Sequence, residues 1–149
     1  MILLVHMLFG AAIGVLVKNI PLAIIIAFLS HYFLDLFPHI EYNIQNIKEK
    51  QWRKAVPQIL KVFLDFGLGI ILILFFSNNK LIILIYGFFA VLPDGLAFIN
   101  HIIQNKILKI HDELHGEKIH FLKYKKISIF WRLLSQIIVV IISIITLYN

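Results

Sequence analysis

Apolar residues are gathered along this chain into five long segments with few charged residues inside them. Each segment is roughly 16–21 residues long, close to the ~20 residues that a helix needs to cross the hydrocarbon core of a bilayer. The first two are the shortest and would suit a thinned bilayer. The pattern predicts an all-α, polytopic membrane bundle of about five transmembrane helices in a single domain (1–149), at residues 2–17, 21–37, 59–76, 81–99 and 127–147.

The connections between these segments alternate in length. Residues 18–20 and 77–80 form tight turns, whereas the connections at 39–56 and 100–126 are long and charged. Only two of the 14 Lys and Arg residues fall on the side of the tight turns. Because positively charged loops stay in the cytoplasm, we expect the N-terminus and both long loops on the cytoplasmic side and the C-terminus outside.

A weak internal repeat relates the two predicted hairpins. His6 and Gly10 open the first hairpin four residues apart, as Asp65 and Gly69 open the second. Phe-Pro-His ends the first hairpin and Leu-Pro-Asp ends the second. The Gly-to-Pro spacings differ by about one helical turn, so the repeat keeps helix phase. The chain is therefore either a duplicated helical hairpin whose halves meet at a polar site, or it shows a chance similarity of a few residues.

The composition supports a membrane protein and restricts the chemistry. Hydrophobic residues make up 60% of the chain, more than a soluble domain of this length usually contains. The net charge of +6 suits loops beside anionic lipid, and nucleic acid is not an expected partner. The N-terminus is apolar from Ile2 onward, so we expect a retained helix and not a signal peptide. Without cysteine, any metal ion must be held by His, Asp or Glu.

All seven histidines and all eight carboxylates fall on the side of the long loops. His31 and Asp35 lie inside an apolar segment, where an ionisable group costs several kcal/mol unless it is paired or hydrated. Four residues apart on a helix, they lie one above the other and could share a metal ion or bridge two. His39 follows one turn later, beyond Pro38. The alternative is a His–Asp hydrogen bond that ties two helices together.

His6 and Asp94 are two further candidate metal ligands. His6 shares a helix face with Gly10 and Gly14, which would let a neighbouring helix approach closely; otherwise it faces lipid headgroups. Asp94 follows Pro93 near the end of the fourth segment, where a carboxylate opposes the helix dipole and a metal ion would compensate it. An ordinary turn aspartate is the alternative.

A second histidine cluster lies in the long loop after the fourth segment. His111 and His115 are one helical turn apart, the spacing with which a helix holds zinc, and Gly116 could end that helix and let His120 fold back. Lysines surround the cluster, so the alternative is a solvated amphipathic linker. With the residues above, the predicted metal ligands are His6, His31, Asp35, Asp94, His111 and His115.

Other ionisable side chains in or beside the apolar segments have several explanations. Asp65 lies one turn from Lys61 and could pair with it. Arg132 lies about one turn inside the last segment, where it could extend to the headgroups or bind a phosphate. We keep Asp65, His39 and His120 as candidates for catalytic roles, because each could complete a metal shell or move protons.

These motifs resemble those of the YdjM-like group, small bacterial membrane proteins described as metal-dependent hydrolases and distantly similar to zinc-dependent phospholipase C. The resemblance rests on His6 before a glycine-rich helix, the Ser-His-x-x-x-Asp stretch at 30–35, the Leu-Pro-Asp stretch at 92–94 and the late histidines. It implies an enzyme of the bacterial cytoplasmic (inner) membrane that hydrolyses phosphoesters with two or three divalent metal ions, zinc being the first choice.

Three hypotheses follow for the function. The leading one is a membrane-embedded, metal-dependent hydrolase that acts on a phospholipid or another amphiphilic phosphoester through a metal-activated water. The second is an intramembrane metalloprotease, because His-Asp-Glu-Leu-His at 111–115 is similar to a His-Glu-x-x-His zinc helix. The third is a metal or proton transporter or a structural membrane protein, although the far half of each segment lacks ionisable groups apart from turn lysines. A second copy of the chain could close a polar cleft, so a homo-oligomer is also open.

Overall fold

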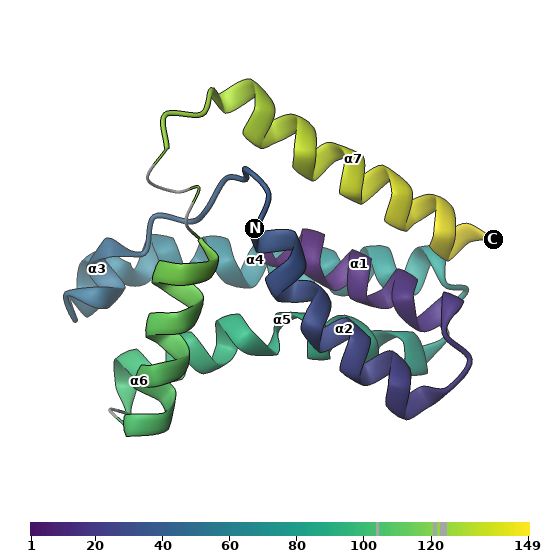
Figure 1. The fold of residues 1–149 in the computed structure, drawn as a ribbon, viewed down its shortest axis with the longest axis horizontal. Helices are drawn as coiled ribbons and strands as arrows, with labels where there is room; N and C mark the ends of the chain where they lie inside the picture. Colours follow the sequence, from purple (N-terminus) through teal and green to yellow (C-terminus); the bar gives the residue numbers. More distant parts are fainter. Residues whose placement is uncertain (104, 121, 123–124) are drawn as a thin grey trace.

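The computed structural model describes residues 1–103, 105–120, 122 and 125–149, and within them the chain forms helices and no strand. The all-α prediction is therefore confirmed for this part of the chain. Most of the long helices run along one direction, and α6 crosses them at one end (Figure 1). The elements are α1 (Leu3–Leu16), α2 (Ile20–Asp35), α3 (Gln45–Lys48), α4 (Trp52–Phe76), α5 (Leu81–Ile102), α6 (Lys106–Glu113), the π-helical turn η1 (Leu114–Ile119) and α7 (Ile129–Tyr148).

Three helices, α4, α5 and α7, are long and apolar enough to cross a membrane. α1 and α2 are also apolar but contain 14 and 16 residues. At ~1.5 Å per residue they extend about 21 and 24 Å, less than the ~30 Å of hydrocarbon in a bilayer. Of the five predicted transmembrane helices, three therefore have the length of a full span and two are shorter.

Two helices extend beyond their predicted boundaries, and each contains a proline in its interior. α4 begins at Trp52 and passes through Pro57, whereas the sequence predicted a start at about residue 59. α5 passes through Pro93 and ends at Ile102, so that Asp94 lies well inside the helix. A proline removes one backbone hydrogen bond and usually marks a helix end, which is why the predicted start of α4 lay just after Pro57. The predicted end of α5, at residue 99, lay beyond Pro93 and three residues short of Ile102.

The shortest of the apolar helices is the most buried one. α1 packs against α2, α4, α5 and α7, and eight of its residues are buried. Its glycines allow the approach of α5: a Cβ atom on Gly14 would lie 1.8 Å from Cδ2 of Tyr86, and one on Gly10 would lie 2.4 Å from Cβ of Ala90. The predicted close approach of a neighbouring helix to this glycine face is confirmed.

The two ends of the bundle differ in their connections (Figure 1). The tight turns between α1 and α2 and between α4 and α5 lie at the end where the C-terminus lies, and the long connections lie at the opposite end. The two hairpins are packed differently, because α1 and α2 contact each other and α5 extensively, whereas α4 contacts α5 little. The similarity between them therefore extends to the order of the elements and not to their packing.

Candidate metal centre

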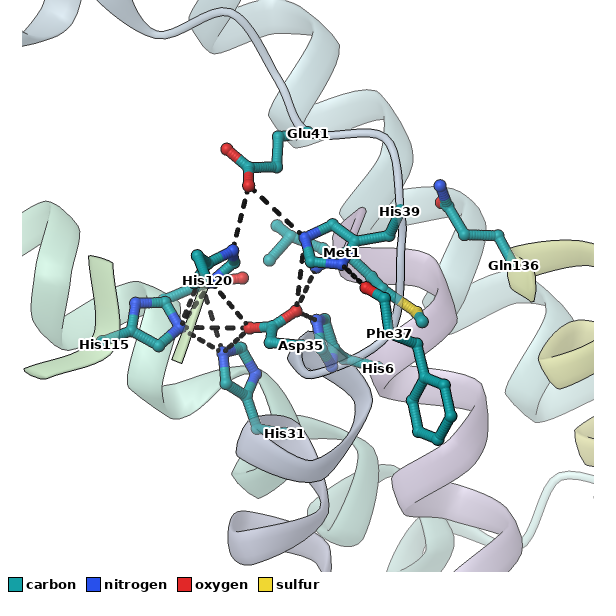
Figure 2. A network of polar contacts seen from close by, with 12 residues as sticks. Met1, His6, His31, Asp35, Phe37, His39, Glu41, His115, His120 and Gln136 are labelled. Carbon is teal, nitrogen blue, oxygen red and sulfur yellow. Dashed lines mark hydrogen bonds and ion pairs between the residues drawn. The ribbon is translucent and has the colours of Figure 1, made fainter. Parts of the chain in front are cut away.

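Side chains that are far apart in sequence converge where α1 begins and α2 ends (Figure 2). They come from the first turns of α1, the last turn of α2, the connection that follows α2, and the π-helical turn after α6. The converging residues are His6, His31, Asp35, His39, His115 and His120.

A π-helical turn brings the two late histidines into register. η1 is wound with i→i+5 hydrogen bonds, so residues five apart lie on the same side of it. His115 and His120 have this spacing, and their ring centroids lie 4.8 Å apart. The sequence predicted that the helix would end at Gly116, which is wrong: the helical winding continues through Gly116 to Ile119.

Asp35 lies at the centre of the cluster and is 1% exposed. Both of its oxygens face Nε2 atoms of imidazole rings, and Oδ1 also forms an ion pair with the amino group of Met1. The carboxylate of Asp35 therefore contacts five imidazole rings. The distances are 3.2 Å from Oδ1 to His6 and 3.7 Å to His39, and 3.1, 3.2 and 3.0 Å from Oδ2 to His31, His115 and His120.

Backbone carbonyl groups orient two of these rings. His31 Nδ1 lies 2.8 Å from the carbonyl oxygen of Ala90, and His39 Nδ1 lies 2.7 Å from that of Phe37. A carbonyl oxygen can only accept, so Nδ1 donates its proton in both contacts. Ala90 lies three residues before Pro93, in the turn where the proline removes a backbone donor. Both rings therefore present Nε2 to the centre of the cluster.

A carboxylate orients the third ring. His120 Nδ1 lies 2.9 Å from Glu41 Oε1, and this same oxygen lies 3.4 Å from His39 Nε2. A histidine that donates one ring N–H to a carboxylate while its other nitrogen faces a metal position is the usual outer-shell arrangement of metal sites. His120 Nε2 is left to face Asp35.

The arrangement requires a cation. When His31, His39 and His120 are neutral and donate through Nδ1, each Nε2 carries a lone pair directed at an oxygen of Asp35 that also only accepts. Acceptor facing acceptor in a buried site is unfavourable, and a proton or a metal ion between them removes the conflict. In the same cluster, both ring nitrogens of His6 are buried and form no hydrogen bond with the described residues. The donor set of nitrogen and oxygen atoms without sulfur fits zinc and similar divalent ions.

Three overlapping groups of residues could hold metal ions among the described residues. In each group, one candidate ligand atom per residue lies within 4.8 Å of the others. Asp94 enters through Oδ1, which lies 3.6 Å from His31 Nε2. The groups share His31 and Asp35, so they form one connected centre. They are His6, His31 and Asp94; His31, Asp35 and His115; and Asp35, His39 and His120.

The electrostatics of the late histidines follow from these contacts. Burial alone would lower the pKa of His120, but the hydrogen bonds to Asp35 and Glu41 outweigh it and raise the pKa to about 9. For His111, burial and the nearby ring of His115 hold the pKa below its usual value. His120 is thus the ring in this part of the site that keeps a positive charge at neutral pH when a proton takes the place of a metal ion.

Two of the predicted site residues lie outside these groups. His111 Nε2 lies 3.0 Å from the hydroxyl of Tyr32, and the His111 ring stacks on His115 at 5.7 Å. Asp65 contacts the start of α1, where its Oδ2 accepts a hydrogen bond from the backbone N–H of Leu4 at 2.8 Å. The structure therefore brings together His6, His31, Asp35, His39, Asp94, His115 and His120, and leaves His111 and Asp65 beside the centre.

Two functional candidates had been missed from the sequence. Glu41 looked like an ordinary loop carboxylate, yet it contacts the rings of both His39 and His120. The His-x-Glu spacing from His39 was the only available signal. Tyr32 lies inside the His-x-x-x-Asp stretch, where no pattern singled it out, but its hydroxyl group contacts His111.

The described residues do not form the catalytic site that the metalloprotease hypothesis requires. Asp112 would have to act as the base beside the zinc, but its Oδ2 accepts a hydrogen bond from the amide of Asn100 at 3.0 Å. His111 and His115 do not share a group of candidate ligands among the described residues. These contacts do not support a His-Glu-x-x-His type of site.

Comparisons of the chain with models of protein families, with curated protein sequences and with solved structures give no match.

Proposed function

We propose that this protein is a membrane-embedded, metal-dependent hydrolase that acts on a phospholipid or another amphiphilic phosphoester. The observation that carries the proposal is the set of Nε2 atoms directed at one buried carboxylate, with Nδ1 of His31, His39 and His120 each held by its own acceptor. A bound divalent ion would lower the pKa of its water toward about 7 and polarise a phosphoryl oxygen.

The residues of the chain have separate tasks in this proposal. His31 and Asp35, each of which belongs to two of the three candidate groups, would be ligands of the metal ions. Glu41 would orient His120 and raise the basicity of its ring. The motif resemblance to the YdjM-like group supports the same reaction class. Zinc is the proposed ion, since His and carboxylate ligands without cysteine suit it.

The position of the cluster supports a lipid substrate. It lies where α1 begins and α2 ends, in a bundle whose long helices could cross a membrane, and the sequence places most of the Lys and Arg residues on the side of the long connections that follow. We therefore propose a cytoplasmic orientation for it in a bacterial inner membrane. A site at this depth meets headgroups before it meets soluble molecules. A transporter would need a polar route to the other end, and the described helices carry their ionisable side chains near this end only, apart from the turn lysines.

Elemental analysis of the purified protein tests the proposal. The wild type should contain one or more equivalents of a transition metal, and Asp35→Asn, which keeps the shape but removes the negative charge, should lose most of it. Asp112→Asn is the matched control and should keep the metal. Hydrolysis of a chromogenic phosphodiester and of phospholipid vesicles should follow the metal content and stop with a chelator. A wild-type protein without stoichiometric metal after reloading would refute the proposal.

A further inference from the structure

A cavity of about 510 Å³ lies against one side of the metal centre. Its walls come from the connection after α2, from the segment after η1 and from the start of α7. The hydroxyl of Ser135 on α7 donates a hydrogen bond to the carbonyl oxygen of Pro38, which holds the start of α7 beside that connection. The cavity is therefore a built feature of the contact between α2, its connection and α7.

Only one of the three candidate metal groups lines this cavity. Asp35, His39 and His120 form part of its wall, together with Glu41, which contacts both rings. The other candidate ligands lie deeper or on another side of the centre and are not among its lining residues. A molecule that enters the cavity would therefore meet the Asp35–His39–His120 position first.

Arg132 is the one Lys or Arg residue among the described residues that line the cavity. It is partly buried, and its Nη2 atom lies 3.4 Å from the carbonyl oxygen of Lys125. Among the described residues this is the one hydrogen bond that the guanidinium group donates, and it leaves most of the five guanidinium donors available to a ligand. A guanidinium group with free donors is the side chain best suited to bind a phosphate by two parallel hydrogen bonds.

The remaining wall of the cavity is apolar and continues to the lipid-facing surface. Phe37 and Ile129 line it and are 43% and 68% exposed. Phe130 and Trp131 follow on the outer face of α7, with 62% and 59% exposed. Because α7 is a candidate membrane span, this wall lies where the headgroup region meets the hydrocarbon. An acyl chain could leave the cavity here without crossing water.

We propose that this cavity binds the phosphate-bearing head of a single- or double-chain amphiphile, with Arg132 holding the phosphate and the wall at Phe37 and Ile129 contacting the first part of the chain. The inference deepens the proposed function, since it states which molecule reaches the Asp35–His39–His120 position and through which residue. Arg132 is in this view a substrate-binding residue that faces the cavity, and its charge offsets the charge of Glu41 on the wall.

Binding measurements in a neutral detergent test the inference; they are made on the purified protein as isolated and again after chelation, when a metal-dependent enzyme cannot hydrolyse the probe. The probes are dodecyl phosphate and inorganic phosphate, followed by calorimetric titration. The wild type should bind dodecyl phosphate at least tenfold more tightly than inorganic phosphate. Arg132→Gln should weaken the binding of dodecyl phosphate about tenfold or more, Arg132→Lys should restore part of it, and Arg53→Gln on α4 should leave it unchanged. Ile129→Asn should weaken dodecyl phosphate but not inorganic phosphate.

The outcomes separate this inference from the proposed function. If Arg132→Gln binds dodecyl phosphate as the wild type does, Arg132 only faces headgroups and the inference is overturned. If inorganic phosphate binds as tightly as dodecyl phosphate, the cavity takes a water-soluble phosphate and the amphiphile is refuted. A protein that binds dodecyl phosphate through Arg132 but contains no metal keeps the inference and refutes the hydrolase. Metal content should be the same in Arg132→Gln and in the wild type.

Discussion

The stability of the metal-free protein should fall as the pH rises from about 6.5 to about 9, because of His120. The folded-state pKa of this ring is about 9, above the usual 6.5, since its hydrogen bonds to Asp35 and Glu41 outweigh the effect of burial. A raised folded-state pKa stabilises the fold fully below the unfolded pKa, and this stabilisation is lost as the pH passes the folded pKa. At ~1.36 kcal/mol per pKa unit, the separation corresponds to on the order of 3 kcal/mol.

Unfolding of chelator-treated protein in mixed detergent micelles, followed by far-UV circular dichroism between pH 6 and 9.5, measures this effect. His120→Gln should flatten the pH dependence, whereas His101→Gln, which removes a histidine outside the candidate groups, should not. Metal-loaded protein should lack the fall, because a metal ion replaces the proton on Nε2 and binds better as competing protons leave. A metal-free wild type whose stability is constant over this range would show that Asp35 and Glu41 do not hold a proton on His120.

Three further substitutions test the packing and the limits of the centre. Gly14→Ala should destabilise the protein by about 1–3 kcal/mol, because the new Cβ would lie 1.8 Å from Tyr86 Cδ2. Gly95→Ala should stabilise the protein by about 0.5–1 kcal/mol, because nothing lies within 4 Å of the new Cβ. Thermal unfolding of the two variants measures both effects. His111→Gln should keep the metal content of the wild type, since His111 contacts Tyr32 rather than Asp35, and elemental analysis showing loss of a full equivalent would contradict this.

The centre of the site could be predicted because ionisable residues are easy to recognise inside an apolar segment. His31 and Asp35 lie in a segment that otherwise has no reason to carry ionisable groups, and their spacing alone puts them on one helix face. His6 could be placed beside another helix because Gly10 and Gly14 allow close packing. The same reasoning could not identify Glu41, because a carboxylate in a charged loop is expected whether or not it contacts a histidine.

Features set by tertiary contacts could not be predicted in the same way. The π-helical turn differs from an α-helix by one residue per turn, and no side chain in 114–119 signals that winding. The start of α4 was misplaced because Pro57 lies inside the helix, and the end of α5 was placed three residues too early, just before the polar residues Asn100 and His101. Hydropathy also does not distinguish a short buried helix such as α1 from a lipid-exposed one, and of the five predicted segments three form helices long enough for a full span and two form shorter helices.

Asp65 offers a test of whether a carboxylate near the centre is catalytic or structural. Ile2, at the N-cap of α1, makes no side-chain hydrogen bond to the helix. Instead, Asp65 Oδ2 accepts from the backbone N–H of Leu4 at 2.8 Å and from the hydroxyl of Tyr42. The backbone N–H of Leu3 donates to the same hydroxyl at 3.2 Å. A negative charge at a helix N-terminus that satisfies free N–H groups stabilises the helix, so the contacts favour a structural role.

Tyr42→Phe and Asp65→Asn should therefore each lower the free energy of unfolding by about 1–2 kcal/mol. Their effects should not add, because both remove parts of one hydrogen-bond network; Tyr148→Phe, at an exposed position, is the matched control. Metal content and turnover below the unfolding temperature should persist, since Asp65 lies outside the candidate groups. The structural role would be refuted if Asp65→Asn abolished turnover while stability and metal content stayed at the wild-type level. Asp65 would then be a proton-transfer residue, the role that the sequence analysis had kept open for it.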